Sequence, residues 1–385
     1  MGQASDAERG RQRIAILFAQ FAPYHVDRIA AAAERLAGIA DVLAVEVAGG
    51  SHTYAWERSR AVPGARKLTL FENARYEDLG TAAKSRAIWD AVRGCDTVFA
   101  GIPYSDRAMI AVCWALRLRG SRVVLMTESK ADDAPRRRWR EAGKRLLLRP
   151  YHAAVVGGPR QAAYVADLGF HSRAVLTGYD TVGVERIRTM AVSAIEPRWE
   201  DRPFLYVGRF VAKKNLFVLL DAYARYARRT GEGARRLAMA GDGPLRAGLE
   251  RHARDLGVAH LVEWPGFLPA EAVAQRMTEG LALLLVSTTE QWGLVVNEAA
   301  ALGLPVIISD NVGARETMVR HGESGLVIPH GDDGSRLAAA LERIAATEAQ
   351  WNAMSAASLR LAPAGDVAHF ADAVAKLIAA PGHGG

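Results

Sequence analysis

The stretch LALLLVSTTEQWGLVVNE, residues 281–298, joins a short apolar run to a polar loop and the start of an amphipathic segment. The run Leu281–Val286 predicts a buried strand, and Leu294–Leu302 predicts a helix. The loop between them contains Glu290 and ends at Gly293. In an α/β sheet such a loop lies at the carboxyl end of a strand, which is where ligands bind.

The same strand-and-helix alternation runs along most of the chain, and it predicts an α/β fold with parallel sheets covered by helices on both faces. The expected strands are Ile14–Phe18, Val42–Val47, Thr97–Ala100, Val123–Met126, Ala153–Val156, Phe204–Val207, Arg236–Ala240, Leu261–Trp264, Leu281–Val286, Val306–Ser309 and Gly325–Ile328. The proline-bounded polar segment Glu196–Pro203 interrupts the pattern and is expected to be a linker.

A chain of 385 residues, half of them hydrophobic, suits two domains. We expect a disordered leader over 1–12, a Rossmann-like domain over 13–180 and a second one over 181–362. The doubly wound sheets would face each other across a cleft. Residues 363–385 are expected to form a helix that packs back on the first domain, followed by a flexible tail.

Several classes of protein are disfavoured. No run of about 18 apolar residues occurs, so no transmembrane helix is expected. The polar N-terminus has no apolar signal core. Cys95 and Cys113 show neither metal-type nor redox-type spacing, so no disulfide framework, zinc site or other metal site is expected. Together these features predict a cytoplasmic protein.

The net charge of +7 is uneven, because the whole excess of Lys and Arg lies within 1–179. The densest part is Pro135–Arg149. Three interpretations of the basic segment 136–149 stay open: a solvated helix face, a surface for anionic lipid or a phosphate-rich substrate, or a nucleic-acid site. No nucleic-acid motif accompanies it, so no nucleic-acid partner is expected.

Two carboxylates flank the predicted helix start in the opening stretch. Glu290 precedes it, and Glu298 lies about one turn inside the helix. Free backbone N–H groups around Gly293, Leu294 and Val295 suit an anion such as a diphosphate. The carboxylates would accept hydrogen bonds from sugar or ribose hydroxyls. On spacing alone, two solvated glutamates explain the pattern equally well.

A second cluster follows the strand Phe204–Val207. Gly208 and Arg209 come directly after this strand, with Lys213 and Lys214 before the next helix. Arg offers a two-pronged contact and Lys a point charge, so these side chains suit a phosphate group. An ordinary basic turn is the alternative. Three further turns, Gly241–Leu245, Gly303–Gly313 and Gly322–Gly325, are weak signals when taken singly.

Taken together and in this order, the motifs resemble those of the retaining GT-B glycosyltransferases of family 4 (glycosyl transferases group 1). The resemblance covers roughly residues 203–330. It rests on Gly208-Arg209, Lys214-Asn215, Gly241–Leu245, Ser287, Glu290, Glu298-Ala299, Gly303, Pro305, Gly313, Glu316, Gly322 and Gly325.

The resemblance implies roles for these residues. Arg209 and Lys214 would hold the donor diphosphate and stabilise the leaving group, Glu290 would contact the donor sugar, and Glu298 would hold the ribose. Backbone groups near Phe267 and Leu268 would touch the base. The Arg/Lys pair would replace a divalent cation, so neither metal nor cofactor is expected.

The first half matches the family less well. The family often has a His in the cleft from this half, for which His25 is the first candidate and His52 the second; a satisfied surface or core His is equally compatible with the sequence at position 25. Tyr24, Tyr104, Asp106 and Glu128 also follow predicted strands and are candidates for acceptor binding. Gly178-Tyr-Asp180 resembles the family's turn at the domain junction.

The predicted activity is transfer of a sugar from a UDP- or GDP-sugar to an acceptor hydroxyl, with retained configuration. The acceptor would be lipid-linked, a polysaccharide or a small molecule, as in cell-envelope or polysaccharide biosynthesis. Alternatives are a sugar-phosphate synthase or other GT-B enzyme with an anionic acceptor, or a catalytically dead nucleotide-sugar-binding or membrane-surface protein. Peripheral contact with the inner face of an anionic membrane through 136–149 is part of this hypothesis.

Overall fold

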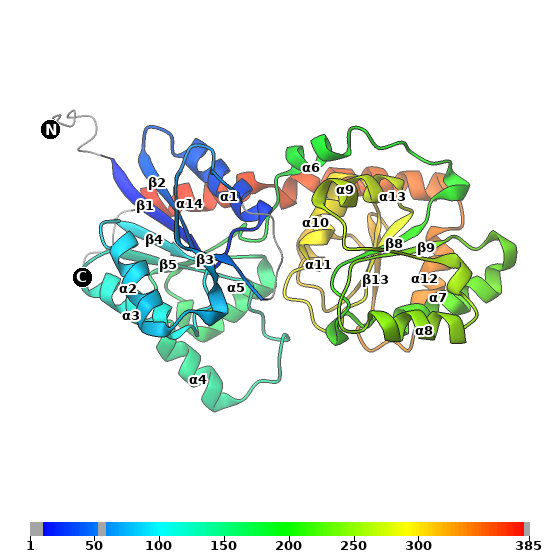
Figure 1. Ribbon diagram of the computed structural model, residues 1–385, viewed down its shortest axis with the longest axis horizontal. Coiled ribbons are helices and arrows are strands. Elements are labelled where there is room, and N and C mark those ends of the chain that lie inside the picture. Colours follow the sequence, from blue (N-terminus) through cyan, green and yellow to red (C-terminus); the bar gives the residue numbers. More distant parts are fainter. Residues whose placement is uncertain (1–10, 53–58, 381–385) are drawn as a thin grey trace. The chain divides into compact units, whose positions relative to one another are not determined.

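The computed structural model describes residues 11–52 and 59–380, in two compact units (Figure 1). The described residues of the first unit are drawn from 11–131, 135–183 and 367–380, and the second unit holds 132–134 and 184–366. Most of the expected leader (1–10) and the end of the expected tail (381–385) lie outside the described residues.

The first unit contains a seven-stranded sheet in the order β3-β2-β1-β4-β5-β6-β7, in which all neighbouring strands are parallel. Its strands are β1 (Gln12–Phe18), β2 (Ala40–Gly50), β3 (Arg66–Arg75), β4 (Thr97–Ala100), β5 (Arg122–Thr127), β6 (Ala153–Val156) and β7 (Ala174–Thr177). Its α-helices are α1 (Pro23–Arg35), α2 (Thr81–Val92), α3 (Arg107–Leu118), α4 (Arg138–Leu147), α5 (Pro159–Val165) and α14 (Val367–Ala379).

Three features of the first unit differ from the expected elements. The edge strands β3 and β7 were not expected; β3 is only half-buried and carries charged residues, so its apolar pattern is weak. Helix α1 begins at Pro23, whereas the sequence pattern predicts a helix over Val26–Gly38. Proline fixes a helical φ at the first position and lacks an N–H that would need a partner. Tyr24 and His25 therefore lie in a helical turn.

The second unit contains a six-stranded parallel sheet in the order β10-β9-β8-β11-β12-β13. Its strands are β8 (Phe204–Val207), β9 (Leu237–Ala240), β10 (Val262–Gly266), β11 (Ala282–Leu285), β12 (Val306–Ser309) and β13 (Gly325–Ile328). Its α-helices are α6 (Val184–Ala191), α7 (Leu216–Thr230), α8 (Arg246–Asp255), α9 (Ala270–Glu279), α10 (Leu294–Ala301), α11 (Arg315–Met318), α12 (Ser335–Ile344) and α13 (Glu348–Leu361).

Both sheets are doubly wound, which confirms the expected fold class. One expectation for the second unit was wrong: the segment Glu196–Pro203 lies inside this unit, where its residues Trp199–Asp201 form a short 3-10 helix. Trp199 packs against Trp351 of α13 with the ring centroids 5.8 Å apart. The segment therefore behaves as a packed part of the unit instead of a linker.

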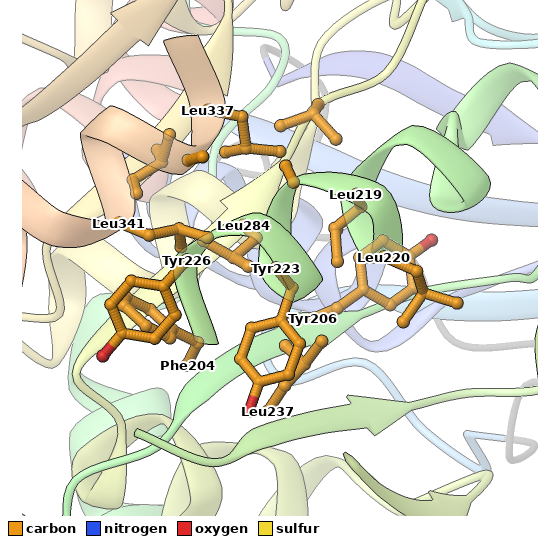
Figure 2. Close-up of a cluster of buried hydrophobic side chains, with 14 of the residues drawn as sticks. Phe204, Tyr206, Leu219, Leu220, Tyr223, Tyr226, Leu237, Leu284, Leu337 and Leu341 are labelled. Atoms are coloured by element: carbon orange, nitrogen blue, oxygen red, sulfur yellow. The ribbon is translucent and has the colours of Figure 1, made fainter. Parts of the chain in front are cut away.

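The sheet of the second unit is buried on both faces. Figure 2 shows one face, where Tyr223 and Leu220 of α7 and Leu337 and Leu341 of α12 belong to the same buried cluster as Phe204 of β8. The other face packs against α9 and α10. Close packing on both faces fixes the strand ends, and with them the loops that carry polar side chains.

The last helix returns to the first unit. α14 packs against α1, and its residues Phe370, Val374 and Leu377 are buried in the same cluster as Ile29 of α1. Gly178 lies close to this helix, since a Cβ at Gly178 would approach the His369 carbonyl oxygen to 2.8 Å. Within the described ranges, no helix is both long enough and apolar enough to span a bilayer.

Candidate functional site

The polar loops of the second unit meet where the strand order reverses. β8 and β11 are neighbours, yet the chain visits β9 and β10 on the far side of β8 between them. The loops that leave β8 and β11 therefore separate at the carboxyl edge of the sheet and leave the crevice typical of ligand sites in doubly wound folds. Arg209 and Lys214 follow β8, and Glu290 follows β11.

Lys214 and Glu290 form an ion pair between these two loops. The Lys214 Nζ donates to Glu290 Oε2, and the Ser287 hydroxyl donates to the same oxygen at 3.0 Å. The Lys214 side chain is 14% exposed and that of Glu290 is 11% exposed. The structure thus brings together two residues that lie 76 positions apart, in a place where few water molecules can screen their charges.

Backbone hydrogen bonds hold the two loops against each other. The Thr288 N–H donates to the Lys213 carbonyl oxygen at 2.8 Å, and the Thr288 hydroxyl donates to that oxygen at 3.2 Å. From β12, the Ser309 hydroxyl donates to the Ser287 carbonyl oxygen at 2.6 Å. The Asn311 side-chain amide donates to the Thr288 carbonyl oxygen. Charged side chains on these loops are therefore held in place before any ligand arrives.

Gly241 gives the Gly208–Arg209 turn its shape. A Cβ at Gly241 would lie 1.9 Å from the Gly208 carbonyl oxygen, and Gly241 has a φ of 142°. The Gly208 N–H donates to the Ala240 carbonyl oxygen at 3.0 Å, and the Tyr206 hydroxyl donates to the Arg209 carbonyl oxygen at 2.9 Å. The turn Gly241–Leu245, weak as a sequence signal, supports the position of exposed Arg209.

The N-terminus of α10 lies beside the ion pair. Gly293 caps this helix with a φ of 98°, and a Cβ there would meet the Leu285 side chain at 2.8 Å. Leu294 and Val295 begin the helix, and Glu298 lies half-buried in it. Since the first N–H groups of a helix have no partner within the helix, this end attracts anions.

A buried tryptophan anchors this helix start. Trp292 is 2% exposed and its indole N–H donates to the Asn297 Oδ1 at 3.0 Å. The Asn297 amide donates in turn to the Gly365 carbonyl oxygen at 3.3 Å. Neither Trp292 nor Asn297 was predicted from the sequence to be a site residue. The signal that points to them is a large aromatic within a polar loop, next to a helix start.

Phe267 and Leu268, which are expected to contact the base of the donor, follow β10 and differ in their exposure to solvent. Phe267 is 70% exposed, whereas Leu268 packs against the cluster on the α9 and α10 face of the sheet. The Gly266 carbonyl oxygen accepts a hydrogen bond from Gly241 N–H at 2.8 Å, which ties this loop to the turn after β9. An exposed aromatic on a fixed loop suits stacking on a planar ring.

Comparison with known proteins finds a family whose members resemble this unit. Residues 194–359 match the model of the family "Glycosyl transferases group 1". The match covers most of the second unit and less than half of the chain. Over 181 residues the chain is 30% identical to a lipopolysaccharide 1,6-galactosyltransferase of Salmonella typhimurium, covering 46% of this chain and 47% of that protein. It is 36% identical over 147 residues to a D-inositol 3-phosphate glycosyltransferase of Frankia alni, covering 36% of each.

Solved structures extend the fold similarity beyond the group 1 unit. A sucrose-phosphate synthase from Thermosynechococcus elongatus superimposes with a TM-score of 0.70 at 20% identity, covering 96% of this chain and 98% of that one. Anabaena HepE in complex with UDP and glucose gives a TM-score of 0.71 at 16% identity, covering 96% and 99%. These similarities confirm the GT-B fold. The match to each curated relative above spans less than half of that relative's length. Membership of family 4 in particular stays a prediction.

In the first unit, His25 lies in the first turn of α1. Its ring stacks on Phe18 with the centroids 3.9 Å apart, and the Tyr24 ring approaches edge-on at 4.5 Å. The His25 Nδ1 lies 3.1 Å from the Ala22 N and 3.2 Å from the Gln20 carbonyl oxygen. Burial, together with the positive charge of Arg28, holds the pKa of His25 well below its usual value, so the ring is neutral at pH 7.

A buried charged group next to His25 was missed by sequence reasoning. Arg28 and Asp180 have fully buried side chains, and Arg28 Nη2 lies 3.7 Å from Asp180 Oδ1. The Arg28 guanidinium lies 5.0 Å from the centroids of both the Tyr24 and Tyr179 rings, and its Nε donates to the Thr181 carbonyl oxygen at 2.9 Å. An Arg on the apolar face of a helix is the signal that could have shown it.

Glu128 belongs to the same group. Burial and the negative charge of half-buried Glu128 raise the pKa of Asp180 well above its usual value. The positive charge of Arg28 acts in the opposite direction and favours the ionised form of Asp180. Glu128, directly after the carboxyl end of β5, is therefore electrostatically coupled to the buried pair of Arg28 and Asp180.

Asp106 and Tyr104 have different surroundings. Asp106 caps α3 by accepting from the Ala108 N–H at 2.8 Å, and its Oδ2 accepts from Tyr76 and Lys84, each at 2.8 Å. The structure thus gives Asp106 a structural task at the start of α3. Tyr104 is half-buried against the cluster beneath α2 and α3. An acceptor role for either residue stays a prediction.

Proposed function

We propose that the chain is a glycosyltransferase that moves a sugar from a nucleoside diphosphate sugar to an acceptor hydroxyl, with retained anomeric configuration. The observation that carries this proposal is the pair of Lys214 and Glu290, held with Arg209 at the reversal point of a group 1 sheet. Cations for a diphosphate and a carboxylate for sugar hydroxyls stand there together, beside the N-terminus of α10.

In this proposal Arg209 and Lys214 act on the leaving group. The bond between the anomeric carbon and the phosphate oxygen breaks, and its electron pair leaves with the diphosphate. The two cations stabilise that charge. The acceptor oxygen bonds to the anomeric carbon on the same face, and its proton passes to the departing phosphate oxygen. Because Arg209 and Lys214 supply the positive charge, we propose that no metal ion is required.

Glu290 and Glu298 hold the donor in place. Glu290 accepts from hydroxyls of the sugar, and its charge is balanced by Lys214 while it does so. Glu298, half-buried on α10, accepts from the ribose hydroxyls, and Phe267 stacks on the base. The relative solved with UDP and glucose makes UDP-sugars the first donors to test, with GDP-sugars next.

We place the acceptor on the first unit. Neutral His25 and the Glu128 carboxylate lie at the carboxyl edge of its sheet, and each offers a hydrogen-bond partner to a hydroxyl. The lipopolysaccharide galactosyltransferase among the relatives suggests a cell-envelope or polysaccharide acceptor.

A donor screen followed by product analysis tests the proposal. The full chain is melted with UDP-, GDP- and ADP-sugars; a donor at 100 times its Kd adds about 2.7 kcal/mol of stability. The product formed from the selected donor is then examined by NMR, where a retained anomeric configuration is expected. Arg209→Ala should lower turnover at least about a hundredfold, while Arg228→Ala, an exposed site on α7, should not. Failure of every donor to raise the Tm would refute the proposed function.

A further inference from the structure

Helix α4 presents apolar side chains to solvent in the middle of a basic surface. Trp139 is 67% exposed and Leu146 is 53% exposed. These residues are seven apart and so lie on one side of the helix, together with Ala142 and Gly143. No residue of α4 is buried, and Figure 1 shows the helix at the margin of the first unit.

Arginines border this apolar stripe. Arg138 and Arg145 lie along one edge and Arg140 along the other, and all three are exposed. The Arg140 guanidinium lies 5.1 Å from the centroid of the Trp139 ring. Within α4 there are four basic side chains and one acidic one. We call this surface, made of Arg138, Trp139, Arg140, Arg145 and Leu146, the α4 face.

The opposite side of α4 is fastened to the unit by polar contacts. Glu141 accepts from the Tyr164 hydroxyl at 2.6 Å and from Lys144 Nζ at 2.9 Å. Arg136 Nη1 donates to the Tyr164 hydroxyl at 2.8 Å. At the edge of the α4 face, the Arg145 Nε donates to the Asp167 carbonyl oxygen at 3.1 Å. Glu141, the acidic residue within α4, is thus turned inward and occupied, so the α4 face takes its charge from its arginines.

We propose that the α4 face docks on an anionic lipid bilayer. A helix with basic edges and an outward Trp and Leu has the form of an interfacial helix, whose apolar stripe enters the headgroup region while its arginines contact lipid phosphates. A soluble phosphate would use the arginines and leave Trp139 and Leu146 without a role. A nucleic acid would call for more than one aromatic among the cations.

Vesicle binding by the full chain tests the charge half of this proposal. The chain should sediment with phosphatidylcholine vesicles that contain phosphatidylglycerol and should fail to sediment with phosphatidylcholine alone. Arg138→Ala with Arg140→Ala should weaken binding about thirtyfold, since each arginine near an anionic surface contributes about fivefold. The matched control is Arg251→Ala with Arg254→Ala, two exposed arginines of α8, which should bind like the wild type.

A second pair of substitutions tests the apolar contribution of Trp139 and Leu146 to vesicle binding. Trp139→Ala with Leu146→Ala should weaken binding about tenfold or more. Val192→Ala with Ile195→Ala removes apolar side chains that are 83% and 85% exposed in the second unit, and should change nothing. Brominated lipids should quench the fluorescence of Trp139, and Trp139→Phe should abolish that quenching.

Several outcomes would overturn the proposal: equal binding to neutral and anionic vesicles, equal weakening by the control pairs, or tight binding to DNA with no binding to vesicles. Because no glycosyl donor is present, vesicle binding does not depend on the transferase activity. If the chain binds vesicles but no glycosyl donor, the proposal for the α4 face stands and the proposed function is refuted.

Discussion

Lys214→Met should destabilise the chain before any donor is bound, because Glu290 would keep a buried charge with no cation beside it. Removing one member of a buried ion pair costs about 3–5 kcal/mol. The side chains here are 14% and 11% exposed and Ser287 still donates to Glu290, so we expect about 2–3 kcal/mol. In a unit of this size such a loss lowers the Tm by about 4–12 °C.

A double-variant cycle separates this effect from catalysis. Lys214→Met combined with Glu290→Gln removes both charges, so the double variant should regain all but about 1 kcal/mol. Its turnover should stay lost, because the diphosphate contact is missing. The assay is thermal melting of the full chain followed by circular dichroism, without nucleotide. Lys213→Met, at the exposed neighbouring lysine, is the control and should stay within about 0.5 kcal/mol of wild type. Additive losses in the double variant would refute the ion pair as a coupled unit.

Three further changes have definite expected results. Glu298→Ala should weaken donor binding about tenfold or more in calorimetry, since a hydrogen bond to a charged group contributes about 1.5–3 kcal/mol; unchanged affinity would refute the ribose contact. Gly241→Ala should abolish donor binding while leaving vesicle binding intact, because its Cβ would collide with the Gly208 carbonyl oxygen 1.9 Å away. His25 has a folded pKa below its unfolded value, so stability should fall as pH drops below about 6.5, and His25→Asn should flatten that slope in pH-dependent melts. An identical slope in His25→Asn would assign the titration to another group.

The sequence predicted the parallel sheets well because fully buried strands such as β4 and β11 are continuous apolar runs. The edge strand β3 was not predicted, because one of its sides has no neighbouring strand and its residues are mixed in polarity. Helix α13 was not expected, because its apolar residues do not gather on one face.

The donor-binding residues were easier to predict from the sequence than the acceptor-binding residues, because they directly follow strands. Arg209, Lys214 and Glu290 lie in loops that directly follow strands, so the order of the strands brings them together. The contact of Lys214 with Glu290 was not predictable, since it depends on β8 and β11 being neighbours. The pairing of Arg28 with Asp180 was not predictable, because it spans 152 positions and Arg28 belongs to no motif. Asp106 was taken only as a candidate for the acceptor, although an Asp directly before a helix also predicts a cap.

The most direct test of the donor site is a calorimetric comparison of a nucleoside diphosphate with its nucleoside, using the base that the donor screen selects. If Arg209 and Lys214 hold the diphosphate, the wild type should bind the diphosphate about a hundredfold or more tighter than the nucleoside, because two charge-assisted contacts contribute about 3 kcal/mol. That advantage should fall below about tenfold in Arg209→Ala with Lys214→Met. An advantage of the same size in the variant would contradict the assignment of the diphosphate to this edge of the sheet.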